Sequence, residues 1–216
     1  MKLNPKHWIT LWREPWRKVF WTAFYAFRRE NGEAKRRDIT LNPDDVVFDI
    51  GGFEGNWAAD IHARFGCEVH VFEPHPGFAS KIKKRFSDNP KITVHDIALG
   101  SSDGTLALSD AGDASSAVSG VEGSIVGHVV DVATFMGSFK SDVALAKINI
   151  EGGEYDLIPA LANAGMLERF KTFQIQFHLY TQDNIADRDA IRADLAKAHT
   201  CDWVYPFVWE QWSLMR

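Results

Sequence analysis

The stretch that decides the fold is Val46-Val47-Phe48-Asp49-Ile50-Gly51-Gly52-Phe53-Glu54-Gly55-Asn56-Trp57. Its first five residues are β-branched or aromatic except for Asp49, which predicts a buried strand. The glycines that follow let the backbone approach a ligand closely, and residues 57–65 continue at helical spacing. A strand, a glycine-rich turn and a helix are typical of the nucleotide-binding turn of a doubly wound sheet. In such a turn the loop amides and the helix N-terminus face the ligand.

A second predicted strand, residues 68–72, ends at Glu73, which lies 22 positions after Gly51. An acid at this spacing binds the ribose hydroxyls of an adenosine-containing cofactor. Phe53 stands where a nicotinamide-binding loop usually has its middle glycine, and Asp49 lies two positions before the loop. A carboxylate there favours a cationic ligand and repels a pyrophosphate. We therefore expect S-adenosyl-L-methionine, which carries a sulfonium and an ammonium, in a hollow that Asp49 and Glu73 share.

The residues expected to bind this cofactor lie at the ends of the first three predicted strands. Asp96 is expected to accept a hydrogen bond from the adenine amino group, and Ile97 to pack beside the ring. The full set is Asp49, Gly51, Gly52, Phe53, Gly55, Asn56, Glu73, Pro74, Asp96 and Ile97.

Length and composition favour one α/β domain with an extension. The chain has 216 residues, of which 45% are hydrophobic and 25% charged, as in a soluble globular protein. It has no apolar run long enough to span a bilayer and no secretory signal. Two cysteines, Cys67 and Cys201, indicate neither a disulfide framework nor a cysteine metal site. A cytoplasmic protein is expected.

The N-terminal segment differs from the rest in charge and aromatic content. Residues 1–37 hold ten lysines and arginines against three glutamates, a net charge of +7, whereas the remainder is −12. Prolines predict helix starts for 5–13 and 15–29, and the tryptophans and phenylalanines at 8, 12, 16, 20, 24 and 27 form an aromatic stripe. This stripe could contact anionic lipid at the inner membrane, or pack on the domain, which we favour. We predict an extension over 1–40 and a catalytic domain over 41–216.

Strands and helices alternate along most of the remaining chain, which predicts a parallel sheet. Helices are expected at 77–86, 155–164 and 187–199, strands at 92–98, 143–150 and 172–179, and a closing hairpin at 203–209 and 212–216. Residues 100–132 break the alternation with repeated glycines and predict a β-hairpin-like insertion with its tip at 113–116. In a doubly wound sheet the loops 49–55 and 149–154 should share one crevice.

Candidate catalytic residues follow the predicted strands 143–150 and 172–179. His178 is the best base by residue type, because an imidazole with a near-neutral pKa can accept a hydroxyl proton. Asn149 can orient a substrate but cannot act as a base. Glu151 lies near the strand tip, although capping is an alternative role. A metal held by Asn149, Glu151 and His178 stays open, but their spacing matches no recognised ligand pattern, so none is predicted.

Three segments together resemble the FkbM-type S-adenosylmethionine-dependent methyltransferases. They are Val47-Phe48-Asp49-Ile50-Gly51-Gly52-Phe53-Glu54-Gly55, Val71-Phe72-Glu73-Pro74 and Ala146-Lys147-Ile148-Asn149-Ile150-Glu151-Gly152-Gly153-Glu154. The likeness covers about residues 45–178. It implies the Rossmann-like class I methyltransferase fold, a mostly parallel seven-stranded sheet with an antiparallel last strand and helices on both faces. It also implies O-methylation and frequent association with glycan or secondary-metabolite synthesis. Many members have Asp where this chain has Asn149. Because Asn cannot act as a base, this difference favours His178 as the base.

The expected function is therefore methylation of a sugar hydroxyl in a bacterial surface polysaccharide or its lipid-linked precursor. The acceptor is a glycan or another small hydroxyl-bearing molecule, with possible membrane contact through residues 1–30. The alternatives are a nicotinamide-dependent oxidoreductase on a similar sheet and a non-catalytic membrane adaptor. Nucleic acid is not expected as a substrate, because the catalytic body is acidic.

Overall fold

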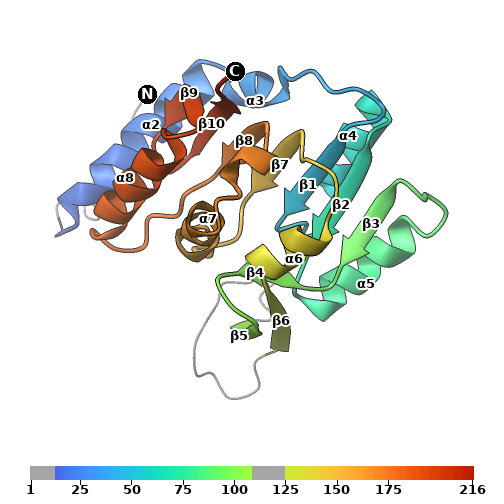
Figure 1. Cartoon of the computed structure of the whole chain (residues 1–216). Helices are drawn as coiled ribbons and strands as arrows, with labels where there is room; N and C mark the ends of the chain where they lie inside the picture. The colour runs from blue at the N-terminus through green and yellow to red at the C-terminus, as the bar shows by residue number, and fades with distance from the viewer. Residues whose placement is uncertain (1–12, 109–124) are drawn as a thin grey trace.

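The computed structural model describes residues 13–108 and 125–216, and its centre is a seven-stranded sheet (Figure 1). The strands are β1 (Val46–Ile50), β2 (Glu68–Phe72), β3 (Ile92–His95), β7 (Leu145–Ile148), β8 (Thr172–Ile175), β9 (His199–Tyr205) and β10 (Trp209–Leu214). Their order is β3-β2-β1-β7-β8-β10-β9. The first five pair in parallel, and β10 runs antiparallel to both neighbours. This confirms the predicted α/β sheet with an antiparallel last strand.

Helices cover both faces of the sheet, as predicted. On one face α4 (Asn56–Phe65) and α5 (Pro76–Arg85) pack over β1 and β2. On the other face α6 (Val132–Ser138), α7 (Glu154–Asn163) and α8 (Asn184–Leu195) cover a larger core around Phe48 and Phe173. Because the central strands are buried on both faces, their sequences are mostly apolar, and Asp49 and Lys147 are buried polar exceptions.

The N-terminal segment packs against the β9–β10 edge of the sheet. A short 3₁₀ helix, η1 (Pro15–Arg17), leads into α2 (Lys18–Arg29), and α3 (Gly32–Arg37) follows. Ala23 and Phe27 of α2 are buried against Tyr205, Val208 and Trp209. The helix expected at 15–29 is confirmed, and this face packs on the domain. The helix expected at 5–13 lies outside the described residues except for Arg13, and the division at residue 40 stays a prediction. Within the described segments, no helix is both long and apolar enough to cross a membrane.

A second, three-stranded sheet is built from the predicted insertion and the chain before it. It contains β4 (Ala98–Gly100), β5 (Gly104–Leu108) and β6 (Ile125–Asp131) in the order β4-β6-β5. The antiparallel pair β5–β6 confirms the hairpin-like insertion, whose tip at 113–116 lies outside the described residues. Figure 1 shows this sheet next to α6 and α7.

Several predicted boundaries are wrong because tertiary pairing overrides local pattern. The strand expected at 92–98 is split between the two sheets. The strand expected at 172–179 ends at Ile175, which is where its pairing with β10 also ends. The helix expected to reach residue 199 ends at Leu195, and His199 begins β9 with its Nε2 bonded to the Phe170 carbonyl at 2.8 Å. The helices α3 and α6 were not predicted.

Candidate active site

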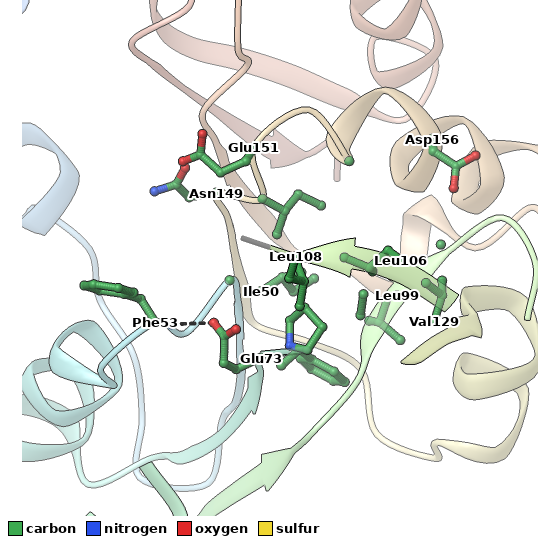
Figure 2. A pocket seen from close by; sticks show the side chains of 17 residues that line it. Ile50, Phe53, Glu73, Leu99, Leu106, Leu108, Val129, Asn149, Glu151 and Asp156 are labelled. Carbon is green, nitrogen blue, oxygen red and sulfur yellow. Dashed lines mark hydrogen bonds between the residues drawn. The ribbon is translucent and has the colours of Figure 1, made fainter. Parts of the chain in front are cut away.

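One cavity of about 340 Å³ lies where the C-terminal ends of β1, β2 and β7 meet the small sheet. Its walls are mainly apolar and include Ile50, Leu99, Leu106, Leu108 and Val129. Figure 2 shows Phe53 and Glu73 on one side of this cavity, and Asn149 and Glu151 on another. The loops after β1 and β7 therefore share a crevice, as predicted. A concave apolar site with a few polar groups is the usual form of a cofactor pocket.

Glu73 is the acid that the sequence placed at the tip of β2, and it lines the cavity. It is only 4% exposed, and its two oxygens accept hydrogen bonds from the backbone amides of Phe53 at 2.7 Å and His75 at 2.9 Å. Burial raises the pKa of Glu73, and these two hydrogen bonds oppose the rise. Each carboxylate oxygen keeps a free lone pair for a ligand hydroxyl.

The glycine-rich loop brings the two strand ends into contact. Gly51 has a φ of +88°, and a Cβ built there would lie 1.9 Å from the Asn149 carbonyl oxygen. The amides of Gly51 and Gly52 both donate to the Phe72 carbonyl, at 3.0 and 3.1 Å, and the Phe53 amide donates to Glu73. The expectation that loop amides face the ligand is therefore wrong for Gly51, Gly52 and Phe53, whose amides fix the shape of the loop instead.

Asp49 does not face the cavity beside Glu73, which corrects the prediction of a shared hollow. Its side chain is fully buried and forms an ion pair with Lys147 at 2.8 Å. Asp49 and Lys147 are opposite each other in the β1–β7 ladder, so their side chains project from the same face of the sheet. The Lys147 ammonium neutralises the Asp49 carboxylate within the protein. Asp49 therefore does not select a cationic ligand.

The other predicted cofactor residues fall into two groups. Gly51, Phe53 and Pro74 line the cavity together with Glu73, whereas Gly52, Gly55, Asn56, Asp96 and Ile97 do not. Gly52 and Gly55 pack against Val71 and Ile82 on the other side of the loop. Asp96 is exposed and pairs with Lys83 at 2.9 Å. The chain turns from one sheet to the other at Asp96 and Ile97, so Ala98 and Leu99 reach the cavity in their place.

Asn149 and Glu151 line the cavity at the end of β7. The Asn149 Oδ1 is buried and has no hydrogen-bond partner among the described residues. Glu151 adopts a left-handed φ of +50° and accepts a hydrogen bond from the Tyr180 hydroxyl at 2.9 Å. A hydrogen bond from His178 lowers the pKa of Glu151 against the opposing effect of burial, so this group is a carboxylate at neutral pH.

His178 lies behind Glu151 and does not line the cavity. Its Nδ1 is 3.0 Å from Glu154 and its Nε2 is 3.4 Å from Glu151. Burial lowers the pKa of His178, but hydrogen bonds to Glu151 and Glu154 outweigh burial and raise the pKa to about 9. His178 is therefore an imidazolium at neutral pH with both nitrogens engaged. The prediction of a near-neutral histidine base is wrong in this arrangement, because two carboxylates hold its proton.

Comparison with known proteins identifies the family. The model of the methyltransferase FkbM domain matches residues 49–200. The chain belongs to the FkbM methyltransferase family. Its methyl donor is S-adenosyl-L-methionine, and the family decides against the oxidoreductase alternative. A search of the curated proteins gives no match.

Solved structures with low sequence identity share the fold. A putative rRNA methylase from Clostridium thermocellum is 10% identical with a TM-score of 0.55, and the match covers 87% of this chain and 95% of that chain. A chain of a fibrillarin/Nop5p complex is 13% identical with a TM-score of 0.54, covering 94% of this chain and 83% of that chain. At these identities the similarity concerns the fold of the FkbM methyltransferase and not its substrate.

The cavity fits the donor of an FkbM methyltransferase. A buried carboxylate with free lone pairs at Glu73 suits ribose hydroxyls, and the apolar walls suit an adenine ring. Asn149, whose buried Oδ1 has no hydrogen-bond partner in the part of the chain that the structure describes, also lines the cavity. In the described segments, no group of three or more His, Cys, Asp or Glu residues is arranged to hold a metal ion.

Sequence reasoning missed several residues of this site. Leu106, Leu108 and Val129 come from the small sheet, whose position over the main sheet has no signal in the sequence. Asp156 lines the cavity from α7 and accepts the amide hydrogen of Ser101 at 2.7 Å. Tyr180, whose hydroxyl donates to Glu151, lies just after the predicted strand. Its position two residues after His178 is the signal that could have placed it near the site.

Proposed function

We propose that this methyltransferase transfers a methyl group to a sugar hydroxyl of a bacterial surface polysaccharide or its lipid-linked precursor. The observation that supports O-methylation most directly is the single cavity with Glu73 at one side and the Asn149–Glu151 pair at another (Figure 2). One end suits an adenosyl group, and the other offers an ionised carboxylate to an acceptor hydroxyl. The choice of a glycan acceptor rests on the family resemblance.

At the donor end, Glu73 would accept hydrogen bonds from the ribose hydroxyls. Pro74 and Leu99 would enclose the adenine, and Gly51 and Phe53 would border the ribose. Asn149 would border the amino-acid part of the donor. The donor supplies a methyl group on a positively charged sulfur. The apolar walls keep water from competing with the acceptor.

At the acceptor end, Glu151 would orient the hydroxyl by accepting its hydrogen bond. The hydroxyl proton becomes strongly acidic while the oxygen takes the methyl group, so a carboxylate of lowered pKa is a sufficient base. Tyr180 and His178 hold Glu151 from behind through contacts of 2.9 and 3.4 Å. We assign His178 to positioning Glu151 and not to proton removal.

The test combines a deletion strain with the purified protein. Deleting the gene should leave the backbone of the surface polysaccharide unchanged and remove an O-methyl group, as measured by mass spectrometry and linkage analysis of the glycan. The purified protein should then release S-adenosylhomocysteine when given the demethylated glycan. An unchanged methylation profile in the deletion strain would contradict the glycan acceptor.

Ribosomal RNA is the competing acceptor, because one structurally similar protein is described as a putative rRNA methylase. The net charge of −12 over residues 38–216 opposes binding of a polyanion by the catalytic body. Methyl incorporation into ribosomal RNA from the deletion strain, with none into its glycan, would favour RNA.

We further propose that residues 1–40 form an extension of a catalytic domain over 41–216. Exposed basic residues Lys18, Arg28 and Arg29 and the half-buried Trp21 and Tyr25 on α2 suit peripheral contact with an anionic inner membrane. A cytoplasmic enzyme held there would meet a lipid-linked glycan precursor.

A further inference from the structure

Lys147 connects the two loops that border the cavity, although it does not line the cavity itself. It is 6% exposed, and its ammonium group donates to Asp49 Oδ1 at 2.8 Å and to the Gly51 carbonyl at 2.6 Å. Gly51 is the residue at which the glycine-rich loop turns toward Asn149. The buried Lys147 ammonium therefore links Gly51, the first residue of the loop, to β1 through Asp49 and to β7 through its own backbone.

Arg36 brings a second cation to the same buried region from the N-terminal segment. Its guanidinium lies 3.5 Å over the ring of Trp209, and its carbonyl accepts a hydrogen bond from Gln174 at 2.8 Å. The side chain is 12% exposed, and its Nε has no hydrogen-bond partner among the described residues. Burial raises the pKa of Asp49, while the charges of Lys147 and Arg36 act in the opposite direction. Arg36 forms its own ion pair with Glu33 at 3.1 Å, and it is placed near Lys147 through Gln174, which is opposite Lys147 in the β7–β8 ladder.

We propose that Lys147 and Arg36 are positioning residues for the methyl donor, because they hold the glycine-rich loop in the shape that the donor site requires. Lys147 acts through the Gly51 carbonyl. Arg36 acts from α3, where its side chain packs on Trp209 and its carbonyl binds Gln174, the neighbour of Lys147 in the β7–β8 ladder. The inference rests on the proposed placement of the donor in the cavity, and it makes α3 part of the donor site although the family match begins only at residue 49.

The test measures binding of S-adenosylhomocysteine by calorimetry and thermal unfolding of each full-length variant. Lys147→Met alone leaves a buried, uncompensated carboxylate, so the informative variant is the double substitution Lys147→Met with Asp49→Leu. Replacing a buried ion pair by an apolar pair is often neutral for stability. We expect this variant to unfold near the wild-type temperature and to bind the probe about tenfold more weakly, since one charge-assisted hydrogen bond to Gly51 is lost. Lys147→Arg keeps both donors and should recover most of the affinity.

Arg36→Gln tests the contribution of α3, with Arg37→Gln as its matched control. Both changes remove one positive charge from the same helix, but the Arg37 side chain is 67% exposed. We expect Arg36→Gln to weaken probe binding severalfold and Arg37→Gln to leave it unchanged. If the double variant does not fold, the comparison of Arg36→Gln with Arg37→Gln still tests the positioning role.

The outcomes separate this inference from the proposed function. If the wild-type protein does not bind S-adenosylhomocysteine, the placement of the donor is wrong. If the wild type binds and the folded Lys147 and Arg36 variants bind equally well, the positioning role is overturned. Weakened binding with normal unfolding supports it.

Discussion

Two carboxylates near the glycine-rich loop have opposite surroundings because of where each one lies relative to its strand. Glu73 comes after the last residue of β2 and turns into the cavity, whereas Asp49 is still within β1 and faces α4. Both are buried, at 4% and 0% exposure. Among the described residues, Glu73 accepts hydrogen bonds only from backbone amides, whereas Asp49 faces an ammonium. Glu73 is therefore the carboxylate that is left to bind a ligand.

Replacing Glu73 by glutamine should weaken donor binding. The change removes the charge and replaces one acceptor oxygen by an NH₂ group. An NH₂ group in place of the oxygen that binds the Phe53 amide cannot accept that hydrogen bond, so the side chain can no longer serve both the Phe53 amide and a ribose hydroxyl as an acceptor. We expect the Kd for S-adenosylhomocysteine to rise by about tenfold or more, as measured by calorimetry. Glu54→Gln, on the exposed part of the same loop, is the control and should bind normally. Equal affinities for the two variants would exclude Glu73 from the donor site.

Glu151→Gln should affect the chemical step and leave the donor affinity unchanged. The amide cannot take the acceptor proton, and general-base contributions are typically about 10²-fold or more, so kcat should fall by that order. Methyl release with the glycan acceptor and calorimetry with the donor product separate the two effects. Glu168→Gln, exposed on the distant η2 (Leu167–Arg169), is the control. A parallel loss of donor affinity would mean that Glu151 belongs to the donor end.

The charge on His178 predicts how stability depends on pH. Its pKa is about 9 in the folded protein and 6.5 as the ordinary value, so folding is favoured by proton binding. The stabilisation is complete below pH 6.5 and is lost as the pH rises through 9. It amounts to about 3 kcal/mol at most. Urea unfolding of the wild type and His178→Gln should therefore differ most at pH 6 and least at pH 10. A difference that grows with pH would show that the histidine is buried as a neutral group.

The same residues show what the sequence can and cannot predict about a site. The spacing of Glu73 from Gly51 was sufficient to place it, because both belong to one local strand–turn–helix–strand unit. The partner of Asp49 could not be predicted, because Lys147 meets it only through the register of two strands 98 residues apart. The pKa of His178 depends in the same way on Glu154, which is 24 residues away.

At the scale of elements, the glycine-rich loop is fixed by close packing of backbone on backbone. Gly51 meets the Asn149 carbonyl and also has a left-handed φ. Gly66, at the end of α4, has a φ of +65°, but a Cβ added there would have no neighbouring atom within 4 Å among the described residues. The two glycines therefore share the conformational requirement and differ in the space around them.

This difference predicts unequal costs for two alanine substitutions. Gly66→Ala should reduce the free energy of unfolding by about 1 kcal/mol, the cost of a left-handed alanine. Gly51→Ala adds a collision with backbone that cannot move without separating β1 from β7, so its cost should exceed that of Gly66→Ala by about 2 kcal/mol or more. Urea unfolding of both variants measures the difference. Similar midpoints would mean that the loop is not held by the Asn149 carbonyl.

Element type was easier to predict than element ends. Strand β1 and helix α4 follow from residue pattern, since one is almost uniformly apolar and the other has helical spacing. The end of β8 and the split between β3 and β4 follow from which strands pair, which is a property of the assembled sheets. The insertion was predicted as β-hairpin-like, but its pairing with β4 in a separate sheet that borders the cavity was not.

At the scale of the whole molecule, the charge is divided between a basic N-terminal segment and an acidic body. The net charges are +7 for residues 1–37 and −12 for the remainder. α2 buries Ala23 and Phe27 on the domain, while Trp21, Phe24 and Tyr25 form a half-buried aromatic group, with the Arg28 guanidinium 5.8 Å over the ring of Phe24. The helix can therefore stay packed and still present basic and aromatic side chains outward.

This arrangement predicts binding to anionic vesicles through α2. The full-length protein should float with vesicles that contain phosphatidylglycerol and not with phosphatidylcholine vesicles, and high salt should weaken the binding. Each basic residue near an anionic surface contributes about 1 kcal/mol, so Lys18→Glu with Arg29→Glu should abolish flotation. The matched control, Lys81→Glu with Lys84→Glu, makes the same change in net charge on the exposed face of α5 and should float normally. If the two double variants behave alike, the attraction comes from net charge and not from α2. If the wild type does not float with either vesicle, the enzyme must meet its acceptor away from the membrane.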